Sequence, residues 1–376
     1  MSATGADAET RGFADLQEAY DYFYVPQFRV TVGDREFSEA DGLLSDLSVD
    51  LSLDAATTFS FTLSYPYDRE QGGFRGFEWE AFEPGRSVRI EMGYGGTTRQ
   101  LLQDGRIQSV QPRFPADSAP TVSVSGFGPL HAMTSVPEPG PDRTSWTRTW
   151  EDTPPHEVVE AVVEERGYEF DGVETVEAGV SPPQIKQEES THDLAFLLRL
   201  GEEYAYELFA RRGTLYFRPP RYDGPPDVVL RYGVSLDSFA PEVNDPGRVD
   251  TVEVRNWDAE RGEEVVGSAS RSDLGVDDRE SGGAAGGTET TETLQLPVAD
   301  EEAARARAKS VLANRLDGTV TGQGECVGLP EIRPGTRLRL ERLTDRFSAV
   351  YYVESATHRF GSSGYRTSFS VKRREL

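Results

Sequence analysis

The chain has 376 residues and a formal net charge of −26, from 65 acidic and 39 basic residues. This length is enough for two or three domains with real cores. The apolar and aromatic residues are too regularly spaced for a disordered acidic chain. We therefore expect a folded, halophilic protein, because salt screens the repulsion between surface carboxylates. No basic stripe is present, which argues against nucleic-acid binding.

Cys326 is the only cysteine, which excludes a disulfide within the chain and a cysteine-ligated zinc site. The N-terminal stretch MSATGADAETRGFADLQ lacks the apolar core of a signal peptide. No run of about 18 apolar residues is available to span a membrane. We expect a protein made in the cytoplasm that does not insert into a membrane by itself.

Residues 1–24 are predicted to form an N-terminal arm, with a short amphipathic helix or arm in FADLQEAYDYFY (13–24). Residues 25–135 then alternate apolar and polar side chains in many short runs separated by Gly and Pro turns. This pattern is typical of antiparallel strands in a barrel or sandwich. We assign this range to a first β-barrel.

Residues 136–226 are predicted to form a small α/β domain. One helix begins at Asp152 or Thr153 as N-cap and ends at Gly167, with a valine face. Ser190 or Thr191 is predicted to cap a second helix. The stretch YAYELFARRGTLYF then predicts a hairpin that turns at Arg212-Gly213.

Residues 227–376 are predicted to form a second β-barrel. The range 268–297 is rich in Gly, Ser, Thr and acidic residues, and we expect a flexible acidic loop with no core role. A helix is predicted over 300–316, capped by Asp300, with Ala304, Ala308, Val311 and Leu312 on one face. Strand patterns return after it.

The two barrel ranges contain similar segments, which predicts an internal duplication. Pro84-Gly85 corresponds to Pro334-Gly335, and each is followed by three strand-like runs. Further matches fall at one constant offset, which pairs the following residues: Ser109 with Ser355, Arg113 with Arg359, Phe114 with Phe360, and Thr121 with Thr367.

No constellation of catalytic, cofactor-binding or metal-ligating residues emerges, so we predict no catalytic site, no cofactor and no metal. The four histidines are scattered, and His358 is interpreted as structural. His156 and His192 lie in the first turns of their predicted helices and are interpreted as exposed cap residues. Cys326 is interpreted as a small core residue. Glu202, Glu203 and Glu207 supply the only candidate carboxylate pair for glycoside hydrolysis, and a chance cluster is the simpler explanation in so acidic a chain.

The stretch QIKQEESTHDLAFLLRLGEEYAYELFARRGTLYF resembles the signature of the phage late-control-gene-D family and of the hub half of VgrG proteins. The residues on that pattern are Gln187, Ser190, Asp193, Phe196, Leu197, Arg199 and Leu200. The strand with Trp257-Asp258 and the closing segment from Ile332 to Arg373 are also similar to the family. The likeness runs from about Val25 to the end.

The resemblance implies a homotrimeric baseplate hub of a contractile phage tail or injection system, with paired tube-type barrels and no enzymatic activity. The implied partners are an inner tube protein or tube initiator above, a separate trimeric spike below, and baseplate wedge proteins beside it. The spike is expected to be separate because the chain ends directly after the second barrel. The alternatives are a particle-borne cell-wall glycosidase and an unrelated all-β surface protein.

Overall fold

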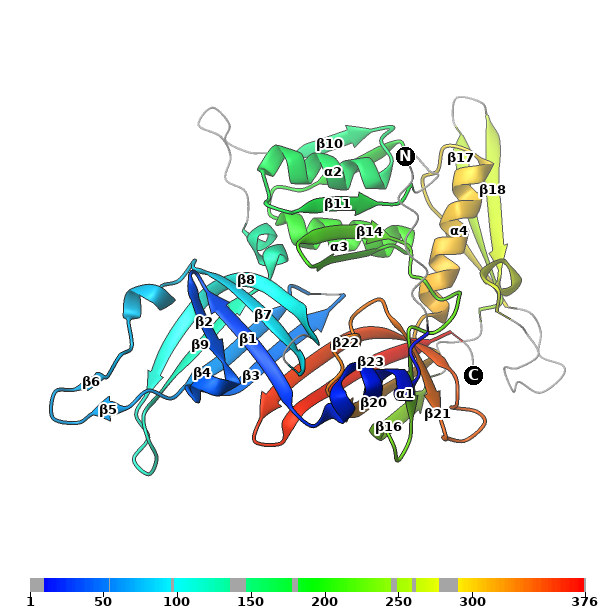
Figure 1. Cartoon of the computed structure of the whole chain (residues 1–376). Helices are drawn as coiled ribbons and strands as arrows, with labels where there is room; N and C mark the ends of the chain where they lie inside the picture. Colours follow the sequence, from blue (N-terminus) through cyan, green and yellow to red (C-terminus); the bar gives the residue numbers. More distant parts are fainter. Residues whose placement is uncertain are drawn as a thin grey trace, which may run out of the picture.

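The structure is a computed structural model, shown in Figure 1. It describes residues 10–53, 55–95, 98–135, 147–177, 182–244, 249–258, 262–276 and 290–374. The protein is mainly β. A large twisted sheet lies at the bottom of the view, a small α/β unit above it, and a helix packed on a small sheet at the right. No helix in the described ranges is long and apolar enough to cross a membrane.

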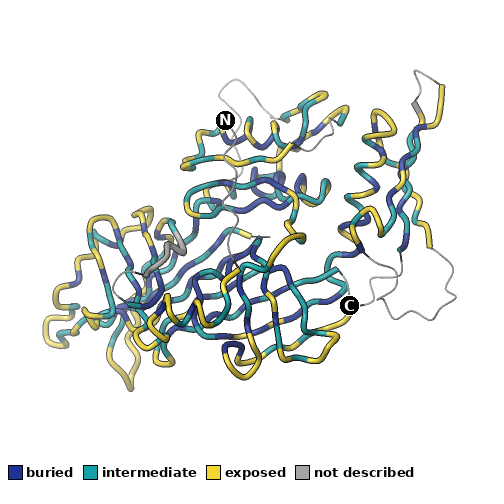
Figure 2. Tube along the Cα trace, turned by 45° about the vertical axis from the view of Figure 1, so that its right-hand side comes forward, coloured by how far each residue is buried: buried dark blue, intermediate teal, exposed yellow. Residues whose placement is uncertain are grey.

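Thirteen strands form one sheet in the described part of the chain. Along its strands buried and less buried residues alternate, as in β4 and β9, and Figure 2 shows the buried stretches running along the strands. Its main path runs β16 (Leu236–Val243), β20 (Val320–Val327), β23 (Gly364–Arg373), β22 (Val350–Gly361), β3 (Leu44–Ser52), β4 (Thr58–Leu63), β9 (Thr121–Phe127), β8 (Thr98–Arg113), β7 (Ser87–Tyr94), β1 (Pro26–Val32) and β2 (Arg35–Ser38). Beside this path, β21 (Arg337–Glu341) pairs with β22 and with β15 (Val228–Arg231). A separate short hairpin joins β5 (Tyr67–Asp68) to β6 (Gly73–Phe74).

The pairing of β3 with β22 joins the two halves of the sheet. Residues 47–52 pair antiparallel with residues 355–360, and Thr357 Oγ1 donates to Asp50 Oδ1 at 2.7 Å. One hydrophobic cluster runs through both halves, from Phe28 to Val371. The ranges 25–135 and 227–376 therefore share a core, and their description as two duplicated barrels stays a prediction.

The two halves have the same strand order. The first runs β3-β4-β9-β8-β7-β1 and the second β16-β20-β23-β22-β21-β15. Each Pro-Gly turn makes the same contact with the next strand. Gly85 N donates to Ile107 O at 2.8 Å, and Gly335 N donates to Val353 O at 2.9 Å. The halves differ at the last strand, because β1 is antiparallel to β7 whereas β15 is parallel to β21.

The irregularities of the two halves also coincide. The register of β8 with β9 shifts at Ile107/Ser109, and that of β22 with β23 shifts at Val353/Ser355. The shift between β3 and β4 at Leu44/Asp46 has its counterpart between β16 and β20 at Leu236/Ser238. β-Bulges keep their positions within a fold, so bulges at matching positions indicate that the two halves are equivalent.

One predicted match between the halves is wrong by one residue. Arg113 pairs with Thr121 in the first half, whereas Arg359 pairs with Arg366 in the second. Thr121 is therefore equivalent to Arg366 and not to Thr367. Counted between these paired residues, the connection from β22 to β23 is one residue shorter than the connection from β8 to β9. A shift of one residue moves a side chain to the opposite face of the sheet, so Thr121 and Thr367 lie on opposite faces.

The N-terminal arm packs on the second half of the sheet. Its helix, α1 (Phe13–Ala19), confirms the helix predicted there, and η1 (Asp21–Phe23) leads from it into β1. Leu16 and Tyr20 are buried, and Tyr20 OH donates to Glu331 Oε1 at 2.6 Å. Arg11 O accepts from Val229 N of β15 at 3.1 Å. Residues 1–9 of the predicted arm lie outside the described residues.

The α/β unit has a core of its own. Two strands, β10 (Arg148–Glu151) and β12 (Gln184–Gln187), form one small sheet, and β11 (Gly172–Thr175), β14 (Thr214–Arg218) and β13 (Glu207–Arg211) form another. The helix α2 (Pro155–Arg166) buries the predicted valine face and ends at Gly167, with φ 64°. Its N-cap is Pro154, so the predicted caps Asp152 and Thr153 are wrong.

The second helix of this unit, α3 (Asp193–Tyr204), begins at a different cap from the predicted Ser190 or Thr191. His192 is its N-cap, and the Nδ1 atom accepts from Ala195 N at 3.1 Å. The imidazole thereby satisfies one of the unpaired N–H groups of the first turn, a role usually taken by Ser, Thr, Asp or Asn. The predicted hairpin turn is confirmed, with φ 52° at Arg212 and 80° at Gly213.

A third unit consists of α4 (Glu301–Leu316) packed on β18 (Glu263–Ser270), β17 (Thr251–Asp258) and β19 (Thr291–Gln295). Asp300 caps α4 as predicted, with Oδ1 accepting from Ala303 N at 2.8 Å. The prediction that residues 268–297 have no core role is wrong for their described parts. Val276 is buried in this core, and β19 pairs in parallel with β17. Residues 277–289 lie outside the described residues.

We expect Leu294→Asp to lower the free energy of unfolding by about 2 kcal/mol, because it places a carboxylate against the core of the third unit. Thr293→Asp is the matched control, since Thr293 is exposed on the opposite face of the same strand. Denaturant unfolding monitored by circular dichroism measures both. Equal losses of stability in the two variants would show that the Leu294 face of β19 is no more buried than the Thr293 face.

Candidate functional site

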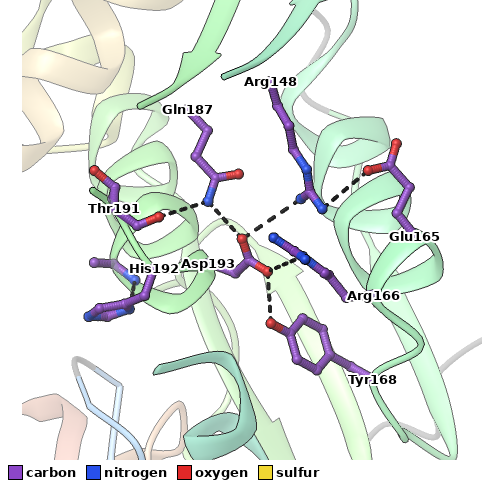
Figure 3. A network of polar contacts seen from close by, with 9 residues as sticks. Arg148, Glu165, Arg166, Tyr168, Gln187, Thr191, His192 and Asp193 are labelled. Carbon is purple, nitrogen blue, oxygen red and sulfur yellow. Dashed lines mark hydrogen bonds and ion pairs between the residues drawn. The ribbon is translucent and has the colours of Figure 1, made fainter. Parts of the chain in front are cut away.

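Asp193, at the start of α3, is fully buried at the centre of a polar network (Figure 3). Its Oδ1 accepts from Gln187 Nε2 at 2.7 Å, and its Oδ2 accepts from Tyr168 OH at 2.7 Å and Arg166 Nε at 3.2 Å. Arg148 Nη1 lies 3.7 Å from Oδ1. Burial, and then the hydrogen bond to Asp193, raise the pKa of Tyr168 well above its ordinary value.

This network connects β10, α2 and its end, β12 and α3 through one carboxylate (Figure 3). The structure thus brings together Gln187 and Asp193 of the signature stretch, and buries Phe196, Leu197 and Leu200 in the adjoining core. Ser190 and Arg199 lie exposed. The described contacts occupy both carboxylate oxygens, so the signature positions stabilise the α/β unit rather than presenting a reactive group.

The three glutamates considered as an acid pair differ in their exposure and in their partners. Glu202 is exposed, and Glu203 forms an ion pair with Arg307 at 3.1 Å. Glu207 is buried, and its Oε2 accepts from Tyr352 OH at 2.6 Å. Burial raises the pKa of Glu207. Glu202 and Glu207 both line a second cavity, of about 530 Å³, which Glu203 does not line. Because Glu207 is bound to Tyr352 and Glu203 to Arg307, these contacts do not indicate the facing pair that glycoside hydrolysis needs.

A cavity of about 690 Å³ lies between α4, the segment after β14 and the second half of the sheet. None of the three glutamates lines it. Asp273 does, and the backbone N–H and hydroxyl of Ser270 hold the pKa of that carboxyl below its usual range. The lining is rich in tyrosines and cations: Tyr204, Tyr206, Tyr222, Tyr351, Tyr352, Lys309, Arg337, Lys372, Arg373 and Arg374.

His358, in β22, is fully buried and neutral. Its Nε2 donates to Ile332 O at 3.0 Å, and its Nδ1 lies 2.8 Å from Tyr365 OH, which donates to it. Burial, and then repulsion by Arg333, lower the pKa of His358 to about 3. Both ring nitrogens thus have a hydrogen-bond partner in the neutral form, which fits the structural role expected of this residue.

The remaining residues considered for chemistry lie apart. His131, His156 and His192 are half-buried, so the expectation that the last two are exposed is wrong. Cys326 is buried, and burial raises the pKa of its thiol. In the ranges that the structure describes, no group of three His, Cys, Asp or Glu side chains is placed to hold a metal ion.

One face of the sheet carries a row of half-buried serines. Neighbouring strands from β8 to β3 align serines at paired positions, namely Ser109, Ser125, Ser60 and Ser48. Ser52, Ser355 and Ser370 continue the pattern across β3, β22 and β23. These aligned serines form a row of small polar side chains that crosses both halves of the sheet.

Two strand edges on opposite sides of the sheet have no partner strand among the described residues. β16 ends the main path of the sheet, and β7 covers β8 only as far as Arg106. The residues of β8 after Ile107 therefore pair with β9 alone. Each open edge contains a proline, Pro241 in β16 and Pro112 in β8, which is typical of edge strands.

Solved structures with this fold are tail proteins. The 43 kDa tail protein of prophage MuSo2 from Shewanella oneidensis has a TM-score of 0.62 and 14% identity, covering 93% of this chain and 97% of its own. A tail protein from Neisseria meningitidis MC58 has a TM-score of 0.65 and 14% identity, with the same coverages. An E. coli component of the type VI secretion system, structurally similar to T4 tail proteins gp27 and gp5, has a TM-score of 0.54 and 10% identity, covering 91% of this chain and 74% of its own.

The chain therefore shares the β-rich fold of these tail and type VI secretion proteins, as the resemblance led us to expect. A family model described as the Alg8 N-terminal domain matches residues 27–361, and the chain belongs to that family. No curated protein matches the chain in sequence.

Proposed function

We propose that the protein is the structural baseplate hub of a contractile phage tail or injection system, related to the late-control-gene-D and VgrG hubs. Three copies form a ring that joins a six-fold inner tube to a three-fold spike. The observation that carries this proposal is the equivalence of the two sheet halves, which share strand order, Pro-Gly contacts and bulge positions.

Symmetry is the proposed mechanism. A ring of three chains that each contain two equivalent halves presents six similar units, so that six tube subunits can make similar contacts. A surface that is present in only one half of the chain occurs three times in this ring. The third unit, formed by β17, β18, β19 and α4, has no counterpart among the described residues of the first half, and it suits a three-fold partner such as the spike.

The proposed role is not enzymatic. A cell-wall glycosidase requires two carboxyl groups facing each other across a substrate, whereas Glu203 and Glu207 bind different partners and Glu202 is exposed. We infer that these glutamates and the buried network at Asp193 serve folding.

Light scattering in molar KCl tests the trimer. One chain has a mass of 41.6 kDa, and we expect a particle of three chains. End-on class averages in electron microscopy should show six similar lobes on one face. A particle of any other stoichiometry that persists when tube and spike proteins are added, or a ring without six similar lobes, would contradict the hub.

A further inference from the structure

The contact between β3 and β22 is a template for a contact between two copies of the chain. It joins the first half to the second within one chain. By the shared strand order and bulge positions, β16 is the equivalent of β3, and β8 is the equivalent of β22. Both equivalents have an open edge among the described residues, at the place where their counterparts meet each other.

We propose that β16 of one copy pairs antiparallel with residues 109–114, at the end of β8, of the next copy. Figure 1 shows β8 in the left part of the sheet and β16 at the lower right, so the two edges of one chain cannot meet each other. The contact is therefore head-to-tail between copies, and a head-to-tail contact closes into a ring or extends into a filament.

The equivalence fixes the register of this pairing. The register of β16 with β20 shifts at Leu236/Ser238, and that of β3 with β4 shifts at Leu44/Asp46. Aligning the two shifts places Leu236 on Leu44 and so aligns β16 with β3. The shift at Ile107/Ser109 likewise aligns β8 with β22. When the β3–β22 pairs are carried over by these two alignments, Glu242 falls opposite Gln111.

The central polar pair keeps its chemistry under this alignment. Within one chain, the Asp50 carboxylate accepts a hydrogen bond from Thr357. Their equivalents are Glu242 and Gln111, so a carboxylate again lies opposite a side chain that can donate. The template and the proposed contact therefore agree at the position where Thr357 donates to Asp50 within one chain.

The pair formed by Arg359 and Ser48 is also compatible with this register. Arg359 lies opposite Ser48 within one chain, and their equivalents are Arg113 and Ala240. An arginine therefore faces a small residue in both contacts, and no two like charges are brought together.

The apolar pairs correspond as well. Ala356 is paired with Leu51 inside the chain, where both are buried, and the equivalent pair between copies is Val110 with Val243. In the same way, Phe114 falls opposite Phe239. Val243 is 40% exposed and Phe114 is 58% exposed, so the proposed contact covers two large apolar side chains that one chain leaves in solvent.

The two edge prolines face each other in this register. Asn244 N donates toward β20, to Thr319 O, so the N–H groups of β16 at positions 243 and 239 point outward. Pro241 lies between them, and Pro112 lies opposite. The ladder between copies thus has hydrogen-bonded pairs on both sides of a proline pair, and the proline pair itself donates no backbone hydrogen bond.

Cysteine cross-linking of the full chain tests this contact. In the variant Gln111→Cys/Glu242→Cys the two positions form a pair without hydrogen bonds, about 4.5 Å apart between Cα atoms, within the range of a disulfide. Both native side chains are exposed, and Cys326 is buried. We expect mild oxidation to convert most of the chain into covalently linked oligomers. The control Gln111→Cys/Ser238→Cys places the thiols out of register and should remain uncrosslinked.

The outcomes distinguish this contact from the proposed function. Only the closure of the ring at three copies rests on the proposed function. Cross-linked species that stop at the trimer support both. A ladder that continues beyond the trimer supports the contact and contradicts the closed hub. Trimers by light scattering that do not cross-link, or equal cross-linking of the control, would overturn the contact and leave the hub standing.

Discussion

Asp193→Ala is expected to lower the free energy of unfolding by about 3–5 kcal/mol, because it leaves a buried charge network without its centre. Arg148 and Arg166 lose their shared carboxylate, and the Gln187 amide and the Tyr168 hydroxyl lose a buried acceptor. Denaturant unfolding at constant salt measures the loss.

Glu188→Ala is the control for this prediction, since it removes an exposed carboxylate near the same helix. Its effect should stay within about 0.5 kcal/mol. If the two variants unfold alike, the network contributes nothing beyond the net charge of the chain, and the signature positions need another explanation.

Stability is expected to fall as the pH decreases from about 6.5 toward 3, by about 1.4 kcal/mol per pH unit from His358 alone. The folded chain keeps this imidazole neutral down to a pKa of about 3, whereas the unfolded chain protonates it near its ordinary value. Protonation of His358 therefore favours the unfolded state between these two pH values. The stability that comes from the neutral imidazole is fully present only above about pH 6.5.

His358→Gln tests the linkage, because the amide can donate to Ile332 O and accept from Tyr365 OH without titrating. The free energy of unfolding should vary less steeply with pH in this variant, by about one proton. The difference in slope isolates His358 from the carboxylates, which titrate in both chains.

Local signals predict several elements correctly. The valine face and Gly167 mark α2, Asp300 marks the start of α4, and the Arg212-Gly213 turn defines a hairpin. These features depend on residues close in sequence. For α3, the interpretation of His192 as a cap residue is confirmed, whereas Ser190 and Thr191, the usual residue types for an N-cap, are not the cap.

Long-range features are harder to predict. The partners of Asp193 come from several elements, and nothing in the spacing of Arg148, Arg166 and Tyr168 identifies them. The strand β19 is obscured because TETLQ follows a Gly-rich run, although its alternation is a strand signal. The repeat is visible in sequence, but its register is off by one residue at Thr121, since pairing depends on the length of the connection.

The pairing of β3 with β22 also has a consequence for biosynthesis. Asp50 and Thr357 are 307 positions apart, so a ribosome that adds about 5–20 residues per second needs roughly 15–60 s between them. Throughout that interval the nascent chain holds β3 with one edge unpaired, a substrate for chaperones and for aggregation. A chain that stops before β22 keeps this edge unpaired, so we expect truncated chains to aggregate more readily than the full chain.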